Sequence, residues 1–196
     1  MPGHEPVLPL QADDHLDWPS DPRPIDREYT VRRFDPIAYE LSLDILVRGE
    51  GMDGPGARWA ADAQPGDVLH IGGPRASHLP PSKVSEVHLI GDLTARPAID
   101  RWLEAPPVER PAHVTLLVSG DEAWDPVGAA SVRRLDLSDE VPELATLPQP
   151  AASAYVWVAG EGSHVSAIRT HLLSHGVPRS AISASAYWWR AGTGDH

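Results

Sequence analysis

The C-terminal part of the chain shows short apolar runs separated by segments with helical periodicity. Five runs predict strands, at residues 84–90, 113–118, 133–137, 154–159 and 181–188. Residues 95–104 and 163–174 have the pattern of helices, the second of them stopped by Gly176. Continuous apolar strands that alternate with helices are typical of a parallel sheet covered on both faces. Residues 83–196 are therefore predicted to form an α/β nucleotide-binding domain of about five strands.

The preceding part of the chain has the alternating pattern of strands with one buried face. Residues 29–34 and 40–47 flank Asp35-Pro36 and predict a hairpin. A short helix is predicted at 57–63 and a further strand at 68–71. Residues 1–26 contain six prolines and several aspartates without sustained periodicity, which indicates an extended arm. We thus expect an arm at 1–26 and a β segment at 27–80, joined to the α/β domain by a proline-rich linker.

Composition excludes several classes of function. The net charge of −12 leaves no basic footprint for phosphates, so nucleic-acid binding is not expected. The sequence contains no apolar run long enough to span a membrane and no signal peptide, so we expect no membrane insertion and a cytoplasmic location. Because the chain has no cysteine, redox chemistry here would require a bound organic cofactor.

Two segments of the β part carry residue types that suit a dinucleotide. Arg27 and Tyr29 lie two apart on an extended segment and so point to the same side, where they could meet a phosphate and a flat ring. Residues 48–56 form a glycine-rich loop before a helix, whose first N–H groups could bind a diphosphate. The alternatives are an ordinary strand and a plain loop before a helix.

Two strand ends of the α/β part have a glycine before a helix. These are Gly91-Asp92-Leu93-Thr94 and Gly160-Glu161-Gly162. In parallel sheets ligands bind at the carboxyl ends of the strands, near the point where the strand order reverses. The alternative is that both segments are ordinary strand-to-helix turns.

Taken in order, these motifs resemble those of the siderophore-interacting proteins, flavin-dependent relatives of the ferredoxin reductases. The segments that carry the resemblance run from Arg27-Glu28-Tyr29-Thr30 through Gly54-Pro55-Gly56 and Gly91-Asp92-Leu93-Thr94 to Trp157-Val158-Ala159-Gly160-Glu161 and Tyr187-Trp188-Trp189-Arg190. The resemblance implies an incomplete flavin-binding β-barrel followed by a parallel-sheet α/β nucleotide-binding domain. The chain differs from the family at three positions: Arg48 replaces a histidine, and Leu93 and Arg96 replace a glutamate and a leucine.

The resemblance also implies an activity and a set of cofactor-binding residues. The activity is transfer of electrons from NADH or NADPH through FAD to a ferric siderophore, with release of ferrous iron. No residue is predicted to be catalytic, because the flavin carries the chemistry. FAD is expected to contact Arg27, Tyr29, Thr30, Gly54, Gly56 and Ala57. The nicotinamide nucleotide is expected at Gly91, Asp92, Thr94, Gly160 and Glu161, with Tyr187 and Trp188 shielding one of the two cofactors.

The sequence says less about the residues that hold the siderophore and about the choice between NADH and NADPH. Arg75, Arg96 and Arg190 are candidates for holding the siderophore, with ordinary surface arginines as the alternative. Asp121 and Glu122 follow the second predicted strand, where an acidic group would favour NADH over NADPH.

No metal site is predicted from the sequence. His171 and His175 lie four apart and so share a helix face, which is the geometry of a two-histidine site, but no third ligand is evident.

The family carries several barrel strands ahead of the Arg27–Thr30 segment, whereas this chain has 26 residues there. An open barrel exposes strand edges and removes a wall of the flavin pocket. We therefore expect either a homodimer through the open edge or weak, exchangeable binding of FAD. The alternative is that the sequence starts within a longer natural chain, in which case the barrel is not truncated. The alternative function is a non-catalytic module that binds a nucleotide or a partner and has lost tight FAD binding.

Overall fold

The computed structural model describes residues 10–12, 15–17, 25–47, 54–73, 79–106, 109–120, 124–137 and 144–190. The chain divides into two units, one comprising Met1–Tyr29 and Ile45–Ser77 and the other Thr30–Asp44 and His78–His196. Each unit is described by itself.

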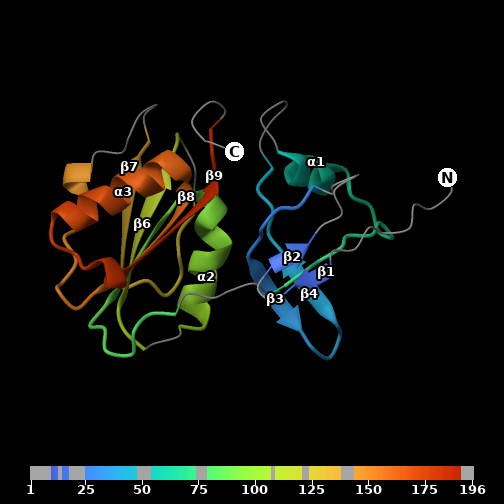
Figure 1. The fold of residues 1–196 in the computed structure, drawn as a ribbon. Coiled ribbons are helices and arrows are strands. Elements are labelled where there is room, and N and C mark those ends of the chain that lie inside the picture. The colour runs from blue at the N-terminus through green and yellow to red at the C-terminus, as the bar shows by residue number, and fades with distance from the viewer. Residues whose placement is uncertain are drawn as a thin grey trace. The chain divides into compact units, whose positions relative to one another are not determined.

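The second unit is built on a five-stranded parallel sheet (Figure 1). Its strands are β5 (Val87–Gly91), β6 (Ala112–Val118), β7 (Ser131–Asp136), β8 (Tyr155–Glu161) and β9 (Ile182–Trp188). Their order is β7-β6-β5-β8-β9, and every neighbouring pair is parallel. The parallel sheet expected from the sequence is confirmed. The strand order reverses between β5 and β8, so their carboxyl ends form the switch point of this sheet.

Two helices cover opposite faces of the sheet, as the doubly apolar strands require (Figure 1). On one face Leu89 packs with Ala95 and with Ile99 of α2 (Arg96–Glu104). On the other, Ile90 packs with Ile168 of α3 (Gly162–Ser174). Successive residues of β5 thus supply two separate cores, which explains why the sequence shows a continuous apolar run there. Short 3₁₀ turns occur at Leu93–Ala95, Leu144–Thr146 and Arg179–Ala181.

Helix α3 ends at the predicted glycine. Gly176 has φ +84°, a left-handed conformation that other residues seldom adopt. Its N–H donates to the carbonyl of Leu173, and the N–H of Val177 donates to that of Leu172. This is a Schellman motif, and Val177 and Leu172 also pack in the same core, as such motifs commonly require.

The β part consists of antiparallel hairpins and one helix. Strands β1 (Leu10–Ala12) and β2 (His15–Asp17) pair with each other inside the predicted arm, whose other residues before 25 lie outside the described part. Strands β3 (Val31–Asp35) and β4 (Glu40–Leu43) form the predicted hairpin, and α1 spans Pro55–Asp62. The strand predicted at 68–71 is wrong. That segment is exposed and pairs with no strand in the described ranges, so its apolar pattern is not stabilised by a ladder.

The hairpin is held to α2 within the second unit. Arg32 of β3 donates from both terminal nitrogens to the two carboxylate oxygens of Glu104, at 2.7 and 2.5 Å. Its Nε lies 3.7 Å from Asp44. A bidentate pair of this kind fixes orientation as well as distance.

Candidate functional site

Tyr29 and Gly56 meet at the start of α1. If Gly56 carried a Cβ, that atom would collide with the hydroxyl of Tyr29, and the ring carbon bearing the hydroxyl would be only 3.1 Å away. The residue is 40% exposed. Burial of the remainder raises the pKa of Tyr29, and the Arg27 cation partly opposes this. The structure therefore brings together two residues that the sequence assigned to FAD from separate motifs.

The first turn of α1 leaves N–H groups without intrahelical acceptors. Gly54 is the N-cap residue and Pro55 occupies the first position; among the described residues no side chain caps this helix. The N–H groups of Gly56 and Ala57 belong to the first turn and carry the positive end of the helix dipole. An aromatic ring thus lies beside an uncapped helix start, an arrangement that suits a flat ring joined to a diphosphate.

The other two residues assigned to FAD flank this contact in sequence. Arg27 is exposed and donates to the carbonyl oxygen of Asp26 at 2.7 Å. Thr30 is half-buried and begins the second unit. The glycine-rich segment 48–53 lies outside the described residues.

At the switch point, two glycines allow close approach of neighbouring elements. A Cβ on Gly91 would lie 2.5 Å from the Cβ of Ala95, so this glycine permits the tight turn into α2. Gly160 has φ +144°, and its Cβ would lie 2.6 Å from Oδ2 of Asp92. Both glycines therefore serve packing within the protein.

Asp92 connects the ends of three strands. Its side chain is buried, with the residue 4% exposed. Oδ1 accepts from the N–H of Thr94 at 2.8 Å and from its hydroxyl at 2.5 Å. Oδ2 accepts from the N–H of Glu161 at 3.0 Å and from Nε1 of Trp188 at 2.9 Å. Residues assigned to the nicotinamide nucleotide are thus brought together, but this carboxylate is used for contacts among them.

Glu161 caps α3 from the end of β8. Its fully buried carboxylate accepts from the hydroxyl of Ser163 and from the N–H of His164 at 3.1 Å. The backbone N–H of Arg190 also lies 3.4 Å from it. Burial raises the pKa of Glu161, but these hydrogen bonds outweigh burial and hold it below its ordinary value. The N-terminal end of α3 is therefore already occupied by a carboxylate of the protein itself, that of Glu161.

His164 is a buried polar residue at this site that the sequence did not reveal. It is 2% exposed, its Nδ1 has no hydrogen-bond partner among the described residues, and that atom lies 3.8 Å from Oε2 of Glu161. Burial lowers the pKa of His164, and the Glu161 carboxylate opposes this. The only sequence signal was a polar residue on an otherwise apolar helix face.

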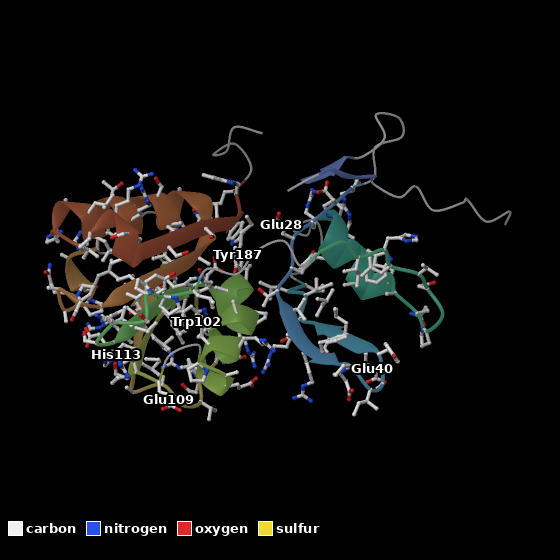
Figure 2. The ribbon with its side chains drawn as sticks, turned by 60° about the horizontal axis from the view of Figure 1, so that its bottom comes forward. Glu28, Glu40, Trp102, Glu109, His113 and Tyr187 are labelled. Carbon is white, nitrogen blue, oxygen red and sulfur yellow. The ribbon has the colours of Figure 1, made fainter. Side chains whose placement is uncertain are left out.

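Three consecutive aromatic residues close the site at the end of β9. Tyr187, labelled in Figure 2, makes an edge-to-face contact with Trp157 at 6.3 Å between ring centroids. Trp188 donates to Asp92, as described above. The indole of Trp189 lies over Gly162, where a Cβ would come within 2.5 Å of it. Tyr187 and Trp189 remain about half exposed and could cover a ligand.

The candidate siderophore residues are only partly described. The guanidinium of Arg96 lies 5.5 Å from the ring centre of Trp124, and its Nε is 3.4 Å from Asp100. The backbone of Arg190 contacts Glu161, while Arg75, Asp121 and Glu122 lie outside the described residues.

The described residues contain no cluster of three or more His, Asp or Glu side chains placed to hold a metal ion. Within the same ranges, no helix is both long and apolar enough to cross a bilayer.

The two candidate cofactor positions differ in their chemistry. The Tyr29–Gly56 contact beside the uncapped start of α1 fits an aromatic dinucleotide such as FAD. The carboxyl ends of β5 and β8 fit the uncharged parts of a nicotinamide nucleotide better than its phosphates, because Asp92 and Glu161 are buried carboxylates.

The fold and the glycine turns at its switch point define a nucleotide-binding α/β domain. Comparison with known families identifies the family to which this domain belongs. A model described as "Siderophore-interacting protein" matches residues 84–191, and one described as "Siderophore-interacting FAD-binding domain" matches residues 1–78. The chain belongs to the siderophore-interacting protein family.

Named relatives agree with this assignment. The chain is 34% identical over 179 residues to the ferric vibriobactin reductase ViuB of Vibrio cholerae, covering 83% of this chain and 63% of that protein. It is 29% identical over 167 residues to the NADPH-dependent ferric-chelate reductase of Escherichia coli, covering 81% and 64%. The chain thus spans less than two thirds of the length of these reductases.

Solved structures extend the similarity to the fold. The siderophore-interacting protein SipS from Aeromonas hydrophila matches with a TM-score of 0.71 and 32% identity, over 94% of this chain and 82% of that one. A siderophore utilization protein from T. fusca matches with the same TM-score and 33% identity, over 94% and 74%. These matches confirm the predicted combination of a β part and a parallel-sheet α/β part.

Proposed function

We propose that the protein is a flavin-dependent reductase that uses NADH or NADPH to reduce the iron of a ferric siderophore through FAD. The observation that carries the proposal is the Tyr29–Gly56 contact at the uncapped start of α1, within a segment that matches an FAD-binding domain. Bound FAD would supply the redox chemistry by accepting two electrons from the nicotinamide and passing them on singly.

The residues of the chain would bind and orient. Tyr29 would pack against the flavin ring, and Arg27 would pair with a phosphate. The N–H groups of Gly56 and Ala57 would donate to the diphosphate. Thr30 and Gly54 complete the proposed FAD contacts.

At the carboxyl ends of β5 and β8, the chain would position the nicotinamide nucleotide by the shape of its backbone. Asp92 would hold the ends of β5, β8 and β9 in place, so that Gly91, Thr94, Gly160 and Glu161 frame the nicotinamide nucleotide. Tyr187 and Trp188 would help to keep water from the reacting rings.

The proposal is tested with the purified protein and FAD. Binding should quench flavin fluorescence, and ferric siderophores of differing charge should be reduced anaerobically by NADH or NADPH, with ferrous iron detected by a chromogenic chelator. Arg96→Ala, Arg190→Ala and Arg75→Ala, assayed with each chelate, would identify which arginine contacts the substrate. Absence of both FAD binding and iron reduction would favour a non-catalytic nucleotide- or partner-binding module.

A further inference from the structure

Two histidine rings face each other at the C-terminal end of α3. His171 lies in the last turn, and His175 is the C-cap residue, whose N–H still donates to the carbonyl of His171 at 3.1 Å. Helical spacing therefore extends through His175, and the ring centroids are 4.1 Å apart with 33° between the planes. The two side chains lie on the same face of the helix in consecutive turns.

One ring nitrogen of His175 faces the backbone. Its Nδ1 lies 2.9 Å from the carbonyl oxygen of His171 and 3.2 Å from Oγ of Ser174. A carbonyl oxygen only accepts, so the first contact is a hydrogen bond in the tautomer that carries the proton on Nδ1 and leaves the lone pair on Nε2. Ser174 also donates its hydroxyl to this carbonyl, at 2.8 Å. A backbone acceptor on one ring nitrogen is the usual support of a histidine that ligates a metal through the other.

The surroundings of the two rings favour a bound cation and leave His171 accessible. The carbonyl end of α3 carries the negative end of the helix dipole, which attracts positive charge. His171 also borders a shallow surface groove of about 580 Å³ with Ser166, Ala167 and Thr170, so solvent can reach it.

The sheet contains a second pair of neighbouring histidines, His88 and His113, whose ring nitrogens have different partners. The rings of His88 and His113 are 5.1 Å apart, but Nε2 of His88 lies 2.9 Å from Glu86, and Nδ1 of His113 lies 2.8 Å from Ser131. Nε2 of His113 also lies 3.6 Å from Oε2 of Glu86, so both ring nitrogens of His113 face groups of the protein.

We propose that His171 and His175 together chelate one divalent transition-metal ion at the end of α3, with water in the remaining coordination positions. The sequence argued against a metal because it offered no third ligand, but the facing rings supply two imidazoles at helical spacing. Imidazole nitrogen suits Cu²⁺, Ni²⁺ and Zn²⁺, with Cu²⁺ bound most tightly of the three. This site is independent of the proposed reductase activity.

Calorimetric titration of the full chain with NiCl₂ at pH 7.5, in a buffer that does not bind metals, tests the site. One equivalent should bind. His171→Ala and His175→Ala should each weaken binding about 100-fold, because the second imidazole acts as an intramolecular ligand. Affinity should also fall below pH 6, where protons compete for the same lone pairs.

The matched control is His70→Ala, which removes an exposed histidine of the first unit and should leave the titration unchanged. Paramagnetic broadening by Ni²⁺ of the amide signals of residues 168–177 would locate the ion. His175→Asn repeats the test at an exposed position, in case His171→Ala disturbs the fold. Wild-type affinity in the single variants, or broadening elsewhere only, would overturn the proposal.

Discussion

The hydroxyl of Tyr29 lies where a Cβ on Gly56 would have to be. Gly56→Ala should therefore displace the ring of Tyr29 and obstruct approach to the first N–H groups of α1. We expect FAD affinity to fall about tenfold or more, which corresponds to a loss of about 1.4 kcal/mol of binding free energy. Fluorescence titration with FAD measures the change.

The collision can be partly relieved by a second substitution. In Gly56→Ala combined with Tyr29→Phe, the atom that would collide first is absent and an aromatic ring remains. The double variant should bind FAD more tightly than Gly56→Ala alone. If the two bind equally, the Tyr29 hydroxyl is not the obstacle.

Asp92 should be among the most sensitive positions of the α/β domain. Asp92→Ala would leave the N–H groups of Thr94 and Glu161 and the indole N–H of Trp188 without their acceptor. Each unsatisfied buried donor costs about 1–3 kcal/mol; the N–H of Glu161 is buried and the other two donors are partly buried, so we expect a loss of about 2–3 kcal/mol in the free energy of unfolding. Urea denaturation measures it. Trp188→Phe removes only one donor and should cost about 1 kcal/mol; equal losses would contradict the shared role of Asp92.

Gly162→Ala should have opposite effects on stability in the wild type and in the Trp189→Ala variant. Alanine is better than glycine in a helix interior by up to about 1 kcal/mol, and the gain is smaller at Gly162, the first residue of α3. In the wild type, however, the new Cβ would lie 2.5 Å from the indole of Trp189. We expect Gly162→Ala to destabilise the wild type and to stabilise Trp189→Ala. Thermal unfolding of the four proteins tests this, and the same sign in both backgrounds would count against the contact.

Glu86 should contribute stability that depends on pH. Its carboxylate lies 2.9 Å from His88 and accepts the N–H of Ala151 at 3.0 Å. The hydrogen bond from His88, and then that from Ala151, lower the pKa of Glu86 in the folded protein. A lowered folded pKa gives stability that is present above the unfolded pKa and is lost as pH falls through the folded one.

We therefore expect Glu86→Gln to reduce the free energy of unfolding by about 1 kcal/mol at pH 7 and by little near pH 3. Denaturation at several pH values measures the difference. Glu109→Gln, at an exposed glutamate labelled in Figure 2, is the control and should show no such dependence. A pH-independent effect of Glu86→Gln would exclude the ionised carboxylate as its cause.

The hairpin of β3 and β4 is the place where self-association is predicted. In the described part of the chain these strands pair only with each other, and Phe34 is 56% exposed. Unpaired strand edges tend to pair with another chain. We expect sedimentation velocity to show a dimer that Phe34→Lys weakens. A concentration-independent monomer would remove this prediction.

The sequence predicted the regular elements well where a local rule defines them. The doubly apolar pattern around Leu89 and Ile90 indicated a covered parallel strand, and Gly176 indicated the end of α3. The segment 68–71 misled because its three apolar residues of four resemble a strand, whereas a strand also needs a partner, which a local pattern does not reveal.

Within the candidate site, residue types could be predicted but their partners could not. Asp92 and Trp188 were both assigned to the site, yet nothing in the pattern showed that they bond to each other across 96 residues of sequence. His164 was missed because burial of a polar residue depends on tertiary packing. The pairing of His171 with His175 followed from helical spacing, but the contact between the two rings required the structure.

The partners of Asp92 also bear on the order in which this domain can form. Asp92 directly follows β5, the first strand of the sheet along the chain, while the groups that bind its second oxygen come much later, from residues 161 and 188. Strands β5, β6 and β7 can associate while the chain is still being synthesised, because they are neighbours in both sequence and space. Contacts between distant residues form only after the intervening loop is closed. The nucleotide-binding end should therefore be completed last, and a ribosome-bound chain that stops before Trp188 should lack it.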